Sequence, residues 1–281
     1  MRIDLHMHSH YSDGALSPDE LLAIGASRGL DQMAITDHDT VNAYGALNNE
    51  SVAALTDAQN LPRLVTGCEF SCLWKGRSIH IVGLNLDLNQ TQLKEGLSTL
   101  EHIRRQRAEA IVAAMVKCGF RLSLEEAEAE AGLGLVGRPH IARVLVASGQ
   151  IKSIAAAFKQ YLGAGKPGDA KAYWPSIEQA IGWIKGAGGV AVVAHPLKYK
   201  MTLTKLRLLL DEFKAAGGMA VEVVSGNQDS ASTRTLSDVA QRFGLLASVG
   251  SDFHQPGQPW ADIGKTPELP AACDPVWQVW S

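Results

Sequence analysis

The 281-residue chain has little of several features that would identify other classes of protein. Its four cysteines are too few for a disulfide framework at this length, so we expect a reducing, cytoplasmic setting. No apolar run approaches the length of about 20 residues that a membrane helix needs, and no charged-then-apolar leader is expected. Lys and Arg number 26 against 29 Asp and Glu, and a net charge of −3 argues against tight binding of duplex nucleic acid.

The remaining composition fits one large domain, or a core with an insert. Hydrophobic residues make up 46% of the chain and charged residues 20%, as in globular proteins. Seven short β-type runs recur with helix-like stretches between them, at 2–5, 32–35, 63–65, 78–82, 190–193, 219–224 and 245–249. This alternation predicts an α/β fold with a parallel sheet, either open or closed into a barrel. The first helix has the clearest start, with Ser17 as N-cap, Pro18 in the first turn and Glu20 completing a capping box.

The segment 90–183 breaks the alternation. It contains successive helical patterns at 93–118, 123–131, 138–148 and 151–161, with no convincing strand. We therefore predict a barrel domain made of residues 1–89 and 184–281, and a small helical insertion domain at 90–183 that caps the substrate.

Polar clusters follow the predicted strands, and they contain most of the histidines. His6 and His8 lie two apart on an extended segment, so both imidazoles point to one side, as two ligands of one metal should. Further clusters lie at 36–39, 68–69, 194–196 and 250–254. The carboxyl ends of parallel strands meet on one face of a sheet or barrel, so these clusters are expected to converge.

Four of these clusters resemble the signature motifs of the polymerase-and-histidinol-phosphatase (PHP) family, within the amidohydrolase superfamily. They are Asp4-Leu5-His6-Met7-His8-Ser9, Thr36-Asp37-His38-Asp39, Ala194-His195-Pro196 and Gly250-Ser251-Asp252-Phe253-His254. The resemblance implies a distorted (β/α)7 TIM-like barrel and a centre of three divalent metal ions.

The same resemblance implies how the ligands are shared. His6, His8, Glu69 and Asp252 would hold the first ion. Glu69 would bridge to a second ion, completed by His80 and His195, and the third would take Asp13, His38 and His254. Imidazole and carboxylate ligands suit Mn²⁺, Fe²⁺ or Zn²⁺, and the family resemblance favours manganese.

The charges of this centre point to phosphate chemistry. Three divalent ions outweigh the carboxylates of Asp13, Glu69 and Asp252, so the filled centre should attract phosphate. Metal-activated water is then expected to attack phosphorus, with Glu69 as the bridging catalytic ligand. Asp37 is expected either to orient a ligand imidazole or a substrate hydroxyl, or to cap the following helix. Asp39 is interpreted as a helix cap.

The insert offers a second set of cations. Arg104 and Arg107 lie on one helix face, and Arg138 and His140 open another helix. With Lys171, they are candidates to bind a further phosphate, although solvated charge is an equal alternative for Arg104 and Arg107.

The insert and its Gly-Arg-Pro-His motif at 137–140 resemble stand-alone bacterial PHP phosphoesterases. That resemblance implies removal of the 3′-phosphate from a small nucleotide, a nucleoside 3′,5′-bisphosphate such as pAp, giving AMP. Alternatives are 5′→3′ exonuclease activity on short 5′-phosphorylated RNA oligonucleotides and histidinol-phosphate phosphatase activity. A non-catalytic PHP module is a further alternative, but such a module should have lost ligands, and here the set is complete.

Overall fold

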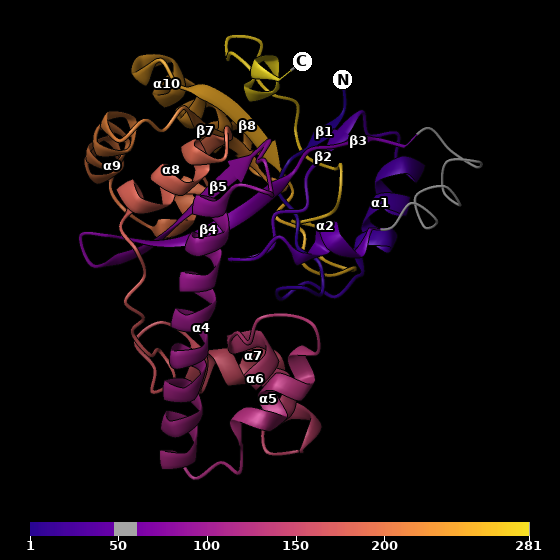
Figure 1. Ribbon diagram of the computed structural model, residues 1–281, viewed down its shortest axis with the longest axis vertical. Coiled ribbons are helices and arrows are strands. Elements are labelled where there is room, and N and C mark those ends of the chain that lie inside the picture. The colour runs from indigo at the N-terminus through magenta and orange to yellow at the C-terminus, as the bar shows by residue number, and fades with distance from the viewer. Residues whose placement is uncertain (48–60, 281) are drawn as a thin grey trace.

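The computed structural model describes residues 1–47 and 61–280, and its strands form two sheets (Figure 1). Three short parallel strands make the first sheet, in the order β1-β2-β3, and five make the second, in the order β4-β5-β6-β7-β8. The strands are β1 (Ile3–Asp4), β2 (Gln32–Met33), β3 (Arg63–Leu64), β4 (Gly67–Trp74), β5 (Arg77–Leu84), β6 (Val190–Val193), β7 (Ala220–Ser225) and β8 (Leu246–Gly250). The α/β class is as predicted.

The second sheet is mixed, which corrects the prediction of a parallel sheet. β4 pairs antiparallel with β5 and β5 antiparallel with β6, whereas β6, β7 and β8 run parallel. Lys75 and Gly76 connect β4 to β5 with φ values of 46° and 77°, the backbone that a two-residue hairpin turn requires. Cys68 and Glu69 therefore lie within a strand rather than after one, and the described residues hold eight strands, not seven.

Backbone hydrogen bonds join the two sheets on both sides. The amide of Leu5, just after β1, donates to the carbonyl of Val249 in β8 over 3.0 Å. The amide of Glu69 in β4 donates to the carbonyl of Asp37, after β2, over 3.1 Å. These bonds hold the ends of β1, β2, β4 and β8 together, but the strands still form two sheets, so a continuous barrel stays a prediction.

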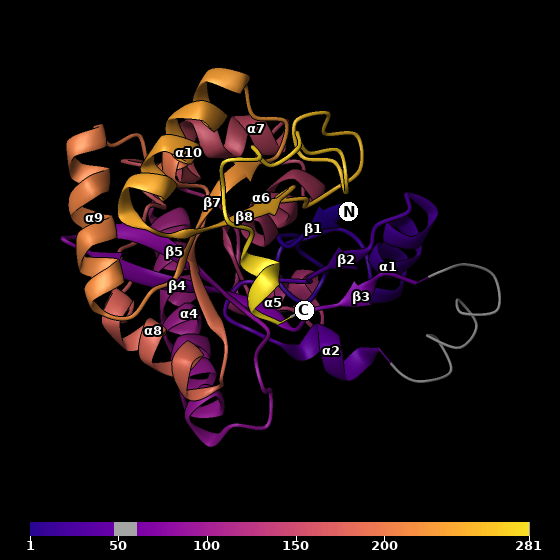
Figure 2. The same cartoon turned by 90° about the horizontal axis from the view of Figure 1, so that it is seen from above.

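Helices cover the outer sides of the sheets. In both views, α8 and α9 lie on the side of the five-stranded sheet, and α1 and α2 lie beside the three-stranded sheet (Figures 1 and 2). The helices are α1 (Pro18–Ser27), α2 (Asn42–Ala46), α8 (Ile177–Gly186), α9 (Leu203–Ala215) and α10 (Ser230–Phe243), with short 3-10 turns at η2 (Pro196–Tyr199) and η3 (Val276–Val279). The capping box of Ser17 and Glu20 at the start of α1 is confirmed.

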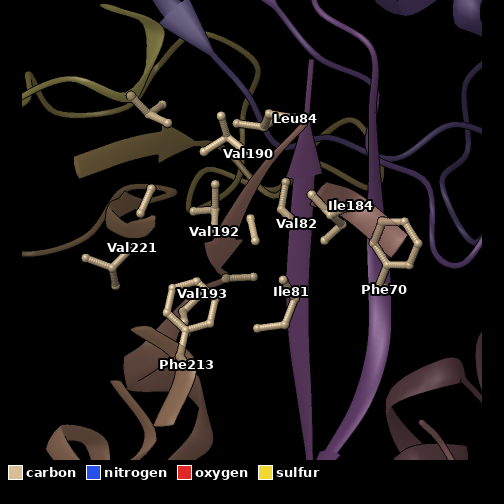
Figure 3. Close-up of a cluster of buried hydrophobic side chains, with 14 of the residues drawn as sticks. Phe70, Ile81, Val82, Leu84, Ile184, Val190, Val192, Val193, Phe213 and Val221 are labelled. Atoms are coloured by element: carbon tan, nitrogen blue, oxygen red, sulfur yellow. The ribbon is translucent and has the colours of Figure 1, made fainter. Parts of the chain in front are cut away.

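Large apolar side chains fill the space between the five-stranded sheet and its helices (Figure 3). Phe70 from β4, Ile81 from β5 and Val193 from β6 pack with Ile184 of α8 and Phe213 of α9, and all five are fully buried. The alternation along β4 places Phe70 in this core and its neighbours on the opposite face. The core thus determines which side chains of β4 face the site.

The predicted helical segment is present, and one long helix connects it to the sheets. Figure 1 shows α4 running away from the sheets with α5, α6 and α7 beside its far half. The elements are α4 (Thr91–Lys117), α5 (Leu124–Ala131), α6 (Arg138–Ala147), α7 (Ile154–Ala157) and the π-helical turn η1 (Phe158–Leu162). Leu93 and Leu100 of α4 belong to the main core, whereas Ile111 and Met115 belong to a second core with α5 and α6. None of the helices described is both long enough and apolar enough to cross a membrane.

Candidate metal centre and substrate cavity

The structure brings all nine predicted metal ligands together where the strands end. Most follow the short strands β1, β2, β6 and β8, while Glu69 and His80 lie within the β4–β5 hairpin. Within each of four overlapping groups, the ligand atoms lie within 4.8 Å of one another. The groups are His8, Asp13, His38 and His254; His6, Glu69 and His195; His6, His8 and Asp252; and His38, Glu69 and His80.

Glu69 lies at the middle of these groups and is fully buried. Its Oε1 is 2.9 Å from Nδ1 of His80 and 2.9 Å from Nε2 of His195. Its Oε2 faces the other way, toward the histidines after β1 and β2. This carboxylate therefore offers one of its two oxygens to each of two neighbouring candidate sites.

The first of these sites is formed by four atoms at similar separations. Nε2 of His6 is 3.4 Å from Oε2 of Glu69 and 3.5 Å from Oδ1 of Asp252. Nε2 of His8 is 3.3 Å from each of the same two oxygens. Two imidazole nitrogens and two carboxylate oxygens thus surround one point.

A further site lies around Asp13. Its Oδ1 is 3.4 Å from Nε2 of His254, 3.9 Å from Nε2 of His38 and 4.0 Å from Nδ1 of His8. Nδ1 of His38 is 2.9 Å from Oε2 of Glu69, which places the ring between this site and the central carboxylate.

Several of these buried atoms have no hydrogen-bond partner, and this supports the fit of cations. Among the described residues, these atoms include Oδ1 of Asp13, Nδ1 of His38 and Oε2 of Glu69. They make no hydrogen bond, although each lies within 4 Å of a side-chain nitrogen or oxygen of the same centre. Burying such groups without partners is costly, and a cation that accepts their lone pairs removes that cost. The donor set of imidazoles and carboxylates fits divalent transition metals.

The electrostatics of the centre also favour positive charge. Burial alone would lower the pKa of His8, but the adjacent carboxylates of Asp252 and Glu69 outweigh it and raise that pKa to about 10. Burial would raise the pKa of Glu69, but His80, His38 and His6 together hold it well below its usual value. The carboxylates around His8 therefore favour positive charge at this point, which a divalent ion would also supply.

Carboxylates behind the ligands hold the imidazoles in place. Glu222 on β7 accepts from Nδ1 of His6 at 3.0 Å and from the backbone amide of His195 at 2.6 Å. Asp37 accepts from Ser12 Oγ at 2.6 Å, and the same hydroxyl lies 3.4 Å from Nδ1 of His8. Asp37 therefore reaches a ligand imidazole through a serine hydroxyl rather than directly, and it does not cap α2, whose N-cap position is Val41.

Two charged residues near the centre were not predicted. Asp4 is buried and accepts the backbone amides of Ser251 and Gly264, each at 2.8 Å, and so ties the segment after β8 to β1. Lys198 forms an ion pair with Oδ2 of Asp252, the oxygen that faces away from the imidazoles. The sequence feature that could have identified Asp4 is its position in the first motif, two residues before His6.

The backbone is strained at two of the predicted ligands, His195 and Asp252, which have φ values of 29° and 53°. Residues other than glycine adopt this region rarely, and it concentrates at functional sites. Asp39 has a φ of 57°, directly after His38. It does not cap a helix, contrary to the interpretation from sequence, because its carboxylate accepts the Ser71 amide at 2.6 Å.

A cavity of about 610 Å³ lies between the metal centre and the helical segment. Its lining includes both metal-centre residues and four of the five predicted substrate-binding residues. The first group is Asp13, His38 and His80; the second is Arg104, Arg107, Arg138 and Lys171. The two sets of residues, far apart in sequence, thus face a common space.

Arg104 is neither solvated nor free. It is buried, its Nε lies 2.6 Å from Oδ2 of Asp39, and its Nη2 donates to Ser71 Oγ at 3.3 Å. Part of its hydrogen-bonding capacity is therefore used to join α4 to the segment after β2 and to β4.

Arg107 is a half-buried cation that a bound anion would stabilise. Its Nε donates to the carbonyl of Ala170 at 3.2 Å, and its guanidinium lies 5.8 Å from the ring of Trp174. Burial, followed by repulsion from Arg138 and Arg104, lowers its pKa to about 10. Three arginines crowded at one end of the cavity would be stabilised by a phosphate among them.

His140 is not among the residues that line this cavity. Its Nδ1 accepts the amide of Gly137 at 2.9 Å, and burial lowers its pKa to about 4. The neutral ring therefore orders the start of α6, where Arg138 is the first helical residue.

Comparison with known proteins agrees with this geometry. Residues 4–185 match the PHP domain family. The chain is 40% identical over 277 residues to a 3′,5′-nucleoside bisphosphate phosphatase of Chromobacterium violaceum, covering 98% of this chain and 95% of that protein. It is also 40% identical over 277 residues to the 5′-3′ exoribonuclease Rnm of Escherichia coli, covering 99% and 93%. The chain belongs to the PHP domain family.

A solved structure supports the assignment. An amidohydrolase from C. violaceum with bound sulfate superposes with a TM-score of 0.88 at 38% identity, covering 99% of this chain and 95% of that one. The resemblance inferred from the motifs is confirmed, and the chain is a phosphoesterase of this family.

Proposed function

We propose that this enzyme removes the 3′-phosphate from nucleoside 3′,5′-bisphosphates such as pAp. The single observation that carries the proposal is that one cavity is lined both by predicted metal ligands and by clustered arginines. Such a cavity suits a small molecule with two phosphates, one at each side. The phosphatase relative in C. violaceum supports the same substrate class.

The proposal includes three divalent ions, with manganese first and Fe²⁺ or Zn²⁺ as alternatives. His6, His8, Glu69 and Asp252 would hold one ion. Glu69, His80 and His195 would hold a second, and Asp13, His38 and His254 a third. When bound, such ions polarise a phosphoryl oxygen and activate water for attack on phosphorus.

The protein's own residues would position the substrate. Arg107 and Arg138, with Lys171, would hold the 5′-phosphate at the far side of the cavity. Arg104, fixed by Asp39, would add its remaining N–H donors to the same wall. Holding the 5′-phosphate there would place the 3′-phosphate at the metal centre, so that binding energy from a remote group orients the reacting bond.

The fold and domain division expected from sequence belong to the same proposal. The two sheets would form the halves of a distorted (β/α)7 barrel, from residues 1–89 and 184–281, with 90–183 as the cap. Helix α8 crosses the second boundary, and Ile177, Ile181 and Ile184 of this helix lie in the main core. The cap would therefore hold the substrate through α4, α6 and the segment before α8.

Cleavage of short 5′-phosphorylated RNA is the second candidate, supported by the relative named as an exoribonuclease. Both reactions would use the same bond, 3′-oxygen to phosphorus, in a nucleotide with a 5′-phosphate. Histidinol phosphate is less well matched, because its amine needs an unpaired acidic group. Asp169 also lines the cavity, but its carboxylate is already paired with Arg138, at 3.8 Å.

A phosphoester panel tests the proposal. The purified enzyme, stripped of metal and resupplied with Mn²⁺, should release phosphate from pAp with a higher kcat/KM than from histidinol phosphate. Chelation should abolish turnover, and metal resupply should restore it. A preference for histidinol phosphate, or turnover that does not respond to metal, would refute the proposal.

Replacing Arg107 with glutamine tests the 5′-phosphate contact. A charge-assisted hydrogen bond is worth about 1.5–3 kcal/mol, so the preference for pAp over 3′-AMP in kcat/KM should fall about tenfold or more. Arg105→Gln is the matched control, since Arg105 is exposed and pairs with Glu109 and Glu128. Equal losses on both substrates would show that Arg107 does not contact the 5′-phosphate.

A further inference from the structure

A second cavity, of about 300 Å³, adjoins the metal centre. It is lined by His195 and Lys198 after β6, by Ser225, Asn227 and Gln228 after β7, and by Trp260. None of its lining residues belongs to the arginine-lined cavity, which is bounded by β4, β5 and the helical segment. The two cavities therefore reach the metal centre through different strands. His195, after β6, lines this cavity, and His80, in β5, lines the arginine-lined cavity.

Trp260 is the main apolar group at this second cavity. Its side chain is far more exposed than a tryptophan usually is, with a residue exposure of 63%. Its backbone is nevertheless fixed, since its carbonyl accepts the amide of Asn227 at 2.8 Å. A fixed backbone with an exposed indole makes a stacking surface for a flat ring.

Polar groups accompany the indole. Ser225 Oγ is a buried atom that has no hydrogen-bond partner among the described residues. Lys198 lines the cavity, and its ammonium pairs with Asp252, one of the predicted metal ligands. A ligand that carries a flat ring, hydroxyls and a negative charge toward the metal centre would satisfy these groups.

We propose that this cavity binds the second nucleotide of a short 5′-phosphorylated oligonucleotide, with its base stacked on Trp260. The inference rests on the proposed function, which places the first nucleotide in the arginine-lined cavity and its 3′-phosphate at the metal centre. In an oligonucleotide that same phosphate continues to the 5′-oxygen of the next nucleotide. The second nucleotide therefore has to leave the metal centre on another side, where this cavity lies.

The bond changes follow from this placement. Water adds to phosphorus, the bond from phosphorus to the 3′-oxygen of the first nucleotide breaks, and that oxygen takes a proton. The first nucleotide leaves as a 5′-monophosphate, and the shortened chain keeps the phosphate on its own 5′-oxygen. The product again carries the 5′-phosphate that the arginines require, so successive rounds can follow.

The experiment compares kcat/KM for the RNA dinucleotide pApA and for pAp, with the Mn²⁺-loaded enzyme. Only pApA has a second nucleotide, the part that the proposal places on Trp260. Loss of one base–aromatic stack should lower the pApA-to-pAp ratio of kcat/KM about tenfold in Trp260→Ala. Trp260→Phe keeps a ring and should recover most of the ratio. Met219→Ala is the matched control. Met219 is exposed and precedes the first residue of β7, whereas the cavity lies after the last, so this variant should keep the wild-type ratio.

The outcomes separate this inference from the proposed function. A wild-type enzyme that cleaves both substrates, with an unchanged ratio in Trp260→Ala, would overturn the second-nucleotide site alone. A wild-type enzyme that cleaves pAp but not pApA would also overturn it. A wild-type enzyme that cleaves neither would overturn the proposed function, and the inference with it.

Discussion

Replacing Glu69 with glutamine is expected to reduce kcat/KM on pAp by about 10³-fold or more, because metal ions supply several kcal/mol of transition-state stabilisation and each 1.36 kcal/mol is a factor of ten. Both oxygens of this carboxylate face imidazoles that belong to two different sites. An amide offers one neutral oxygen and one NH2 group, so at least one site loses a ligand atom.

Metal content provides a readout that does not depend on turnover. Bound Mn²⁺, measured by elemental analysis, should fall in Glu69→Gln, and the rise in Tm that Mn²⁺ gives the wild type should shrink accordingly. Glu109→Gln is the matched control, because Glu109 is exposed on α4 and pairs with Arg105. Full metal content and activity in Glu69→Gln would show that the central carboxylate is not a ligand.

Replacing Arg104 with methionine is expected to lower the free energy of unfolding by about 3–5 kcal/mol, the usual result of removing one partner from a buried ion pair. Asp39 would then remain fully buried, with Ser71 as its main partner. Urea unfolding of the protein without substrate measures the effect. The same change should raise KM for pAp, because the cavity wall would lose the N–H donors that Arg104 offers beside its bond to Asp39.

Two further variants test the expected loss of stability in Arg104→Met. Arg105→Met removes a neighbouring arginine whose ion pairs are exposed, and it should cost at most about 1 kcal/mol. Asp39→Asn combined with Arg104→Met removes both charges, and asparagine tolerates the left-handed backbone at this position, so part of the loss should be recovered. Equal destabilisation by Arg104→Met and Arg105→Met would show that the buried ion pair contributes no more to the free energy of unfolding than the exposed pairs do.

The metal centre could be located from sequence because its ligands follow a local rule. Most of the polar clusters come after a short strand, β1, β2, β6 or β8, and parallel strands end at one edge, whereas Glu69 and His80 lie within the β4–β5 hairpin. His6 and His8, for example, share one extended segment. The structure brings all nine predicted residues together, although the ions they would hold remain a proposal.

The parts that sequence reasoning missed depend on pairings between distant residues. The β4–β5 hairpin was not recognised, because its strands lack strict alternation and its turn, Lys75-Gly76, is short. Arg104 and Asp39 are 65 positions apart, and nothing in either local pattern indicates that they meet. The role of Asp39 follows from its positive φ and its contact with Ser71, neither of which is apparent from the local sequence.

The 27-residue helix α4 has a consequence for how substrates are distinguished. It carries Arg104 and Arg107, and it packs in both hydrophobic cores. A continuous helix is stiff along its axis, and Arg104 is bound to the residue that follows His38. The separation between the arginines and the metal ligands is thus set before any molecule enters, so a compound whose two phosphates are spaced differently should engage one end or the other, but not both.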